Sequence, residues 1–122
     1  MAAIIIIEDS AYTRTKMRTV LEAEGHEIVE ASNGTQGLQI VFTRNPDCVI
    51  LDLIMPEIDG IKLLKAIRDK DSKIPVLVVT ADIQESVRQQ CMDMGATAFL
   101  SKPVKEEELR STVRKIIQGR SR

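Results

Sequence analysis

The stretch VILDLIMPEIDG (residues 49–60) decides the fold of this chain. Three aliphatic residues precede Asp52 and three apolar residues follow it, which is typical of a strand buried on both faces. An unpaired carboxylate in such surroundings costs several kcal/mol. We therefore expect Asp52 to end a buried strand and to have partners that stabilise its charge.

The rest of the chain repeats this pattern, as short aliphatic runs that alternate with segments of helical periodicity. The predicted strands are residues 3–7, 27–31, 48–52, 75–80 and 98–101. Between them, apolar residues recur at helical spacing; Leu38, Val41 and Phe42, for example, fall on one predicted helix face. Five such alternating units predict an α/β fold, a doubly wound five-stranded parallel sheet with five helices.

Residues that favour helix ends stand between these elements. Asp9 or Ser10 is expected to cap the first helix and Asn33 the second, because their side-chain oxygens accept hydrogen bonds from free helical N–H groups. Gly25 and Gly95 follow predicted helices and suit the left-handed conformation that ends many helices. The residues that favour helix ends and the aliphatic runs therefore predict the same boundaries between helices and strands.

Length and composition exclude several classes of function. The chain has 122 residues, which suits a single domain over residues 1–122. Its 17 basic and 18 acidic residues give a net charge of −1, which offers no electrostatic case for direct binding to nucleic acid or to a membrane. No apolar run approaches the ~18 residues of a membrane span. Residues 1–7 resemble a strand rather than a signal peptide, so we expect a cytoplasmic protein with reduced Cys48 and Cys91.

Polar side chains gather at the predicted carboxyl ends of the strands, where function lies in open α/β sheets. Glu8 and Asp9 follow the first strand, Asp52 ends the third, Thr80 ends the fourth and Lys102 follows the fifth. Two carboxylates about 6 Å apart repel each other by about 3 kcal/mol at an effective dielectric near 20. Lys102 and a hard divalent cation with oxygen ligands, Mg²⁺ above all, would balance these charges.

The same combination describes a site for phosphoryl transfer. A metal ion and the Lys102 ammonium stabilise charge on a transferred phosphoryl group, and the Thr80 hydroxyl can hydrogen-bond one of its oxygens. Asp52 is then the expected nucleophile and would form an aspartyl phosphate.

Motifs in separate parts of the chain give a specific resemblance to a known family. Glu8-Asp9, Asp52 with LIMPEIDG, VVTA (78–81) and SKP (101–103) resemble the receiver domain of bacterial two-component response regulators, and most of all the chemotaxis regulator, over residues 3–118. The resemblance implies a flavodoxin-like sheet with strand order 2-1-3-4-5. It also implies a signalling phosphoacceptor, not an enzyme beyond its own phosphorylation and dephosphorylation.

The resemblance assigns a metal site to these residues. Asp9, Asp52 and the backbone carbonyl of Ile54 are expected to bind Mg²⁺, with Mn²⁺ as a substitute, and Glu8 is expected to act through metal-bound water. Many members of the family have aspartate where this chain has Glu8. The longer side chain is expected to loosen the metal site.

The resemblance also implies a source of the phosphoryl group, residues that change conformation after its transfer, and a surface that a partner protein contacts. Asp52 accepts the phosphoryl group from a histidine kinase or phosphotransfer protein, and Lys102 pairs first with Asp52 and later with the phosphoryl group. Thr80 then shifts toward the phosphoryl oxygen and Phe99 turns inward. An unknown downstream protein would contact the fourth helix, fifth strand and fifth helix. A cis peptide is expected between Lys102 and Pro103.

Other functions fit parts of the sequence. A flavin carrier shares the architecture, but Glu8 and Asp9 would repel the flavin phosphate. A phosphatase with an aspartate nucleophile needs a second acid two residues after Asp52, where this chain has Ile54. A receiver that only binds proteins would have no use for Asp52 and Lys102. We expect a stand-alone receiver; the alternative is the N-terminal receiver of a larger response regulator or hybrid kinase.

Overall fold

A computed structural model describes residues 2–56, 58–70 and 73–120 of the chain. Within them, five strands and five helices alternate: β1 (Ala3–Ile7), α1 (Ala11–Ala23), β2 (Glu27–Ala31), α2 (Gly34–Arg44), β3 (Cys48–Leu51), α3 (Gly60–Lys70), β4 (Val76–Thr80), α4 (Glu85–Asp93), β5 (Ala98–Ser101) and α5 (Glu106–Arg120). The strands pair in parallel in the order β2-β1-β3-β4-β5. The predicted doubly wound fold and strand order are confirmed.

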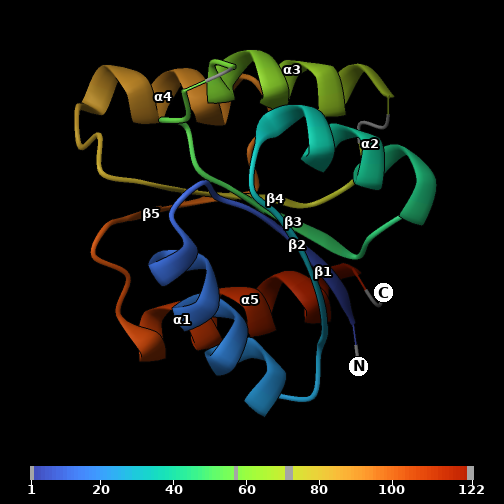
Figure 1. Cartoon of the computed structure of the whole chain (residues 1–122). Coiled ribbons are helices and arrows are strands. Elements are labelled where there is room, and N and C mark those ends of the chain that lie inside the picture. The colour runs from blue at the N-terminus through green and yellow to red at the C-terminus, as the bar shows by residue number, and fades with distance from the viewer. Residues whose placement is uncertain (1, 57, 71–72, 121–122) are drawn as a thin grey trace.

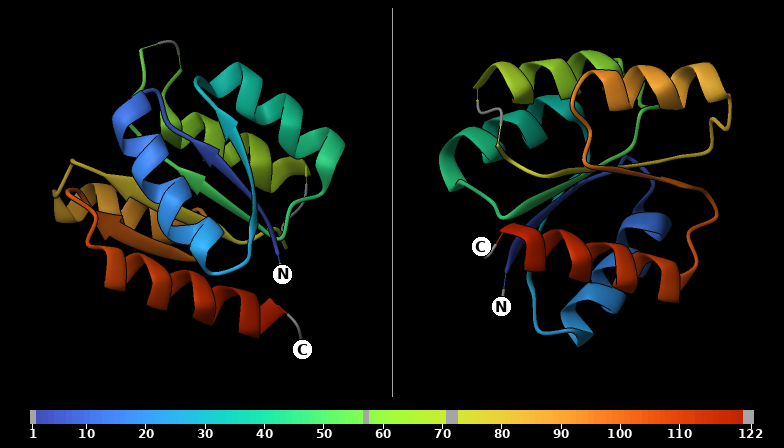
Figure 2. Two further views of the ribbon diagram at one scale, coloured as in Figure 1. Left: turned by 60° about the horizontal axis from the view of Figure 1, so that its bottom comes forward. Right: turned by 180° about the vertical axis from the view of Figure 1, so that it is seen from behind.

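The sheet is the middle of three layers (Figure 1). Helices α1 and α5 cover one face, and α2, α3 and α4 cover the other, as the view from behind also shows (Figure 2). Successive residues of β1 alternate between the two faces: Ile4 and Ile6 pack on the α1–α5 side, Ile5 and Ile7 on the opposite side. Neither face of this strand meets solvent, which explains its unbroken aliphatic sequence.

The strand register places the end of β3 beside the ends of its neighbours. Ile7 of β1 pairs with Leu51, and Leu51 pairs with Val78 of β4. The strand ends at Leu51, one residue earlier than predicted. The backbone turns at this point because the Asp52 carboxylate accepts the N–H of Ile54, a side-chain bond that favours a turn over a continued strand.

The predicted helix ends are also present. Ser10 caps α1 by accepting the N–H of Thr13, and Asn33 caps α2 in the same way. Gly25 and Gly95 follow α1 and α4 with positive φ angles of 89° and 98°. These residues therefore stop each helix close to the predicted position.

Two further details differ from the sequence prediction. Strand β4 begins at Val76 rather than at Pro75, because proline has no N–H to donate to the ladder. On α2, Val41 is buried but Phe42 is exposed, so the predicted apolar face was too wide by one residue. The Phe42 ring instead lies against a cation, with its centroid 5.4 Å from Nζ of Lys70 on α3.

Candidate functional site

Asp52 lies directly after β3, at the carboxyl edge of the sheet, and is only 4% exposed. Both of its carboxylate oxygens have partners. Oδ1 accepts the N–H of Ile54 at 3.1 Å, and Oδ2 accepts a hydrogen bond from Nζ of Lys102 at 3.0 Å. These bonds explain how a charged residue can directly follow a strand between two apolar layers, since an unpaired carboxylate there would be costly.

Lys102 joins two of the buried acids. Its Nζ lies 3.0 Å from Asp52 Oδ2 and 2.5 Å from Glu8 Oε1. The peptide that follows it, Lys102–Pro103, is cis, as predicted. Burial alone would lower the pKa of Lys102, but the bonds to Glu8 and Asp52 outweigh burial and raise the pKa. The ammonium therefore stays charged while it holds both carboxylates.

Glu8 is the second buried acid, and its carboxylate is held at both oxygens. Oε1 accepts from Lys102, and Oε2 accepts the N–H of Ser10 at 3.0 Å. Burial raises the pKa of Glu8 and outweighs these two hydrogen bonds, which lower it. The sequence predicted the pairing of Lys102 with Asp52; the structure adds Glu8 as the closer partner.

The third acid, Asp9, is exposed at the rim of the cluster. One carboxylate oxygen from each of Glu8, Asp9 and Asp52 lies within 4.8 Å of the others. When all are ionised, these three acids and Lys102 leave two negative charges uncompensated, which is the charge of one divalent cation. Oxygen donors with one side open to solvent fit Mg²⁺ or Mn²⁺, because Mg²⁺ retains several waters and needs few carboxylates.

The other predicted site residues differ in burial and lie on separate elements. Thr80 is fully buried at the end of β4, and its Oγ1 accepts the N–H of Asp82 at 3.3 Å. Phe99 on β5 is partly buried against the core beneath α2, α3 and α4. The Ile54 side chain is exposed beside Asp52. Side-chain hydrogen bonds therefore join Glu8 and Asp52 to Lys102, and within the described part of the chain none joins the side chains of Thr80, Phe99 or Ile54 to these three residues.

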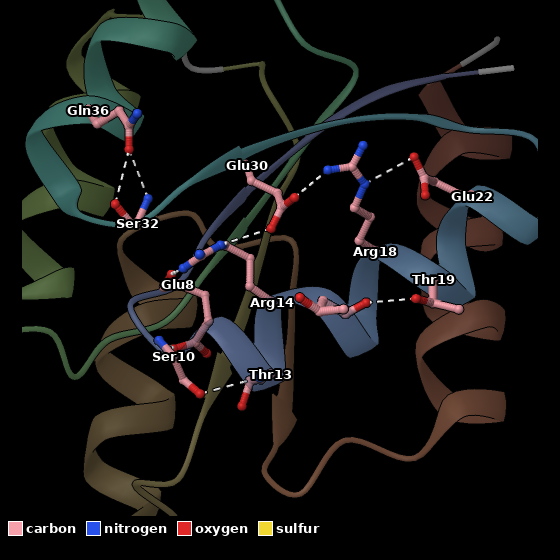
Figure 3. Close-up of polar contacts among 11 residues, drawn as sticks. Glu8, Ser10, Thr13, Arg14, Arg18, Thr19, Glu22, Glu30, Ser32 and Gln36 are labelled. Atoms are coloured by element: carbon pink, nitrogen blue, oxygen red, sulfur yellow. Dashed lines mark hydrogen bonds and ion pairs between the residues drawn. The ribbon is translucent and has the colours of Figure 1, made fainter.

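Arg14 of α1 and Glu30 of β2 form a charged network beside the acidic cluster (Figure 3). The sequence alone did not indicate either residue. Arg14 donates from Nη1 to the backbone carbonyl of Glu8 at 2.7 Å and from Nε to Glu30 at 2.9 Å. Arg18 also binds Glu30 and reaches Glu22 on its own helix. The sequence offered little signal for this network, because residues 14 and 30 meet only through the packing of α1 on the sheet.

The ion pairs of Glu30 predict a pH-dependent contribution to stability. The hydrogen bond from Arg18 lowers the pKa of Glu30, and the bond from Arg14 adds to this effect, although burial opposes it. A carboxylate with a lowered folded-state pKa stabilises the fold above its unfolded-state pKa of about 4.3. That stability is lost as the pH falls through the folded-state pKa. We expect Glu30→Gln to lower the free energy of unfolding by about 1 kcal/mol at neutral pH, with the difference disappearing in acid.

Urea unfolding followed by circular dichroism, from neutral pH downward, measures this difference. Glu27→Gln is the matched control, because Glu27 is exposed on the same strand and forms no ion pair among residues 2–56, 58–70 and 73–120. A difference between the parent and Glu30→Gln that stays constant into acid would contradict the prediction.

Comparison with known proteins identifies the class to which this fold and site belong. The family model of the response regulator receiver domain matches residues 4–114, and the chain therefore belongs to that family. Members take part in two-component signalling and bind Mg²⁺ in an acidic pocket, and Glu8, Asp9 and Asp52 form an acidic cluster here. No helix within the described part of the chain is long and apolar enough to cross a bilayer.

Individual relatives match almost the whole chain. Protein PilH of Pseudomonas aeruginosa is 35% identical over 121 residues, a match that covers 98% of this chain and 100% of that protein. Sporulation initiation phosphotransferase F of Bacillus subtilis is 34% identical over 118 residues, which cover 97% of this chain and 95% of that protein. Among solved structures, chemotaxis protein CheY4 of Vibrio cholerae is 28% identical, with a TM-score of 0.89 over 95% of this chain and 98% of that one.

Proposed function

We propose that this receiver is a phosphoacceptor, which takes a phosphoryl group on Asp52 from a phosphohistidine of a histidine kinase or phosphotransfer protein. One observation carries the proposal: Asp52 is buried with Oδ2 on the Lys102 ammonium, in a cluster of acids that opens to solvent at Asp9. A buried carboxylate beside a fixed cation is suited to attack phosphorus and to share the charge that develops. The likeness to a protein named a phosphotransferase agrees with this chemistry.

The proposed transfer forms one bond and breaks another. A carboxylate oxygen of Asp52 attacks the phosphorus as the P–N bond of the phosphohistidine breaks, and the released imidazole takes up a proton from water. Lys102 stays with the transferred oxygens and stabilises their charge. Asp9, Asp52 and the Ile54 carbonyl would hold Mg²⁺ or Mn²⁺, with Glu8 acting through water, and the metal supplies further charge stabilisation when bound.

The phosphoryl group would then draw Thr80 toward it, because the Thr80 hydroxyl can donate a hydrogen bond to a phosphoryl oxygen. In this structure Thr80 Oγ1 accepts the N–H of Asp82, and Asp82 Oδ1 accepts the N–H of Gln84 immediately before α4. If Thr80 moves toward the phosphoryl group so that its hydroxyl donates to a phosphoryl oxygen, Oγ1 moves away from the N–H of Asp82, and the loop that leads into α4 is released. The loop thereby couples the phosphorylation site to the start of a surface helix.

We propose that the downstream protein contacts the surface formed by α4, β5 and α5. Arg88 and Gln89 are exposed on α4, and Met92 and Phe99 are partly buried in the same region. An inward rotation of Phe99 after Thr80 shifts would change this surface, and the partner would bind the changed form more tightly.

Acetyl phosphate and Mg²⁺ test the proposal directly. We expect the parent protein to gain the mass of one phosphoryl group in intact mass spectrometry, and Asp52→Asn to gain none. Asparagine keeps the shape of the side chain but lacks the nucleophilic carboxylate. An equal gain in both proteins, or no gain in the parent, would show that Asp52 is not the acceptor.

The exposed Ile54 side chain predicts slow loss of the phosphoryl group. An apolar side chain two residues after Asp52 cannot orient an attacking water, whereas an amide can. We expect Ile54→Asn to shorten the half-life of the phosphoprotein roughly tenfold, measured by intact mass after acetyl phosphate is removed. Ile83→Asn is the control, because Ile83 is an exposed apolar residue of the β4–α4 loop. Equal half-lives in the parent and Ile54→Asn would refute the prediction.

A further inference from the structure

We propose that Arg14, held in place by Glu30, is a positioning residue that fixes the Glu8–Asp9 peptide and thereby sets the affinity of the acidic cluster for a divalent cation. The proposal deepens the proposed function and rests on it. Arg14 contacts none of the three carboxylates, so its effect acts through the backbone that carries two of them.

The backbone of Glu8 is anchored to β2 by two routes. Its N–H donates to the carbonyl of Ala31 at 3.1 Å, which is a direct bond to the last residue of β2. Its carbonyl accepts from Arg14 at 2.7 Å, and Arg14 is bound to Glu30, the neighbour of Ala31. Because both routes end on adjacent residues of one strand, the Glu8 backbone has little freedom to rotate.

Figure 3 draws the charged network of Glu22, Arg18, Glu30 and Arg14, and the solvent exposure of these side chains decreases toward Arg14. The side chains of Glu22 and Arg18 are 46% and 42% exposed, whereas those of Glu30 and Arg14 are 24% and 17% exposed. A charge-assisted hydrogen bond is stronger where water is excluded. The bond from Arg14 to the Glu8 carbonyl is therefore the protected end of the network, and the pair of Arg18 with Glu22 is its solvated end.

The Glu8 carbonyl belongs to the peptide that leads into Asp9, and this connection links Arg14 to the metal ligands. The Glu8 carboxylate is fixed independently by Lys102 and Ser10. No residue in the described part of the chain donates a hydrogen bond to the Asp9 carboxylate, so its position depends on the backbone alone. Loss of Arg14 should thus release Asp9 and leave the Glu8 side chain in place. Partners that orient metal ligands typically contribute about 10- to 100-fold in metal affinity.

Calorimetric titration with MgCl₂ tests this role without any phosphorylation. We expect Arg14→Met to weaken Mg²⁺ binding at least about tenfold, and Arg18→Met to change it less than about twofold. Arg18→Met is the matched control, since it also removes an arginine bound to Glu30 from the same helix. In the metal-free protein, the amide resonance of Asp9 should shift in Arg14→Met and stay in place in Arg18→Met.

A second variant separates geometry from charge. Arg14→Lys keeps the charge but lacks the planar fork that serves the Glu8 carbonyl and Glu30 together, so it should bind Mg²⁺ nearly as weakly as Arg14→Met. It also keeps the test decisive if Arg14→Met does not fold. Parent-like affinity in Arg14→Lys, or in Arg14→Met, would overturn the inference while the proposed function stands. Absence of Mg²⁺ binding in the parent would overturn the inference together with the metal site of the proposed function.

Discussion

Replacing Lys102 with methionine is expected to slow phosphorylation of Asp52 by acetyl phosphate about a hundredfold, and to raise the affinity for Mg²⁺ up to about tenfold. The two effects have opposite signs because Lys102 acts on two different species. Under the proposed function it would stabilise negative charge on the transferred phosphoryl oxygens, and it would repel a divalent cation that binds the same carboxylates. Methionine keeps most of the apolar stem and removes only the ammonium.

The same substitution should destabilise the metal-free protein. Lys102 bonds both Glu8 and Asp52, and both acids are almost fully buried. Removal of one partner leaves buried carboxylates without their cation, which costs about 3–5 kcal/mol in fully buried pairs. We expect about 2 kcal/mol here, because Lys102 itself is partly exposed, and saturating Mg²⁺ should recover much of this loss.

Lys105→Met provides the control for these measurements. Lys105 lies three residues further on, is exposed, and forms no side-chain ion pair within the described part of the chain. Its replacement should leave phosphorylation, Mg²⁺ affinity and stability unchanged. If Lys102→Met binds Mg²⁺ more weakly than the parent, the lysine does not compete with the cation for the carboxylates.

Replacing Gly60 with alanine is expected to lower the free energy of unfolding by about 3 kcal/mol. Gly60 begins α3, and a Cβ atom there would lie 2.3 Å from Cα of Leu53 and 2.8 Å from the carbonyl oxygen of Asp52. Both contacts are with backbone, which cannot rotate away as a side chain can. Displacement of this segment should also reduce phosphorylation, because the segment carries Asp52, the proposed phosphoacceptor.

Urea unfolding followed by circular dichroism suits this test, because the chain has no tryptophan. Gly119→Ala is the control, since a Cβ at Gly119 has no neighbour within 4 Å and alanine favours the helical conformation of α5. We expect Gly119→Ala to be neutral or slightly stabilising. A loss below about 1 kcal/mol in Gly60→Ala would show that the loop after β3 can move aside at little cost.

The fold could be predicted almost completely from the sequence, because aliphatic runs between helical segments allow few arrangements. Convergence of Glu8, Asp9 and Asp52 could also be predicted, since the carboxyl ends of parallel strands share one edge of the sheet. The bond between Lys102 and Glu8 could not be predicted. It depends on whether the side chain of Glu8 or that of its neighbour Asp9 lies nearer the end of β5. Its detection required the register of four strands, β1, β3, β4 and β5.

The support from Arg14 and Glu30 was also beyond prediction from the sequence. Charged residues on a helix and at a strand end are usually solvated, and nothing in their spacing distinguishes this pair from others in the chain. Phe42 shows the same limit on a smaller scale. Helical periodicity placed it toward the core, but the rotation of α2 on the sheet leaves its ring against Lys70.

The ion pair of Lys102 with Glu8 joins residues 94 positions apart, and its bond to Asp52 spans 50 positions. Contacts between such distant residues form late in folding, because the entropy of closing a long loop must first be overcome. A chain that is still folding thus holds Asp52, the proposed nucleophile, without the Lys102 ammonium beside it. Under the proposed function, a newly synthesised molecule would not accept a phosphoryl group until β5 has packed onto the sheet. Only fully folded molecules would then take part in signalling.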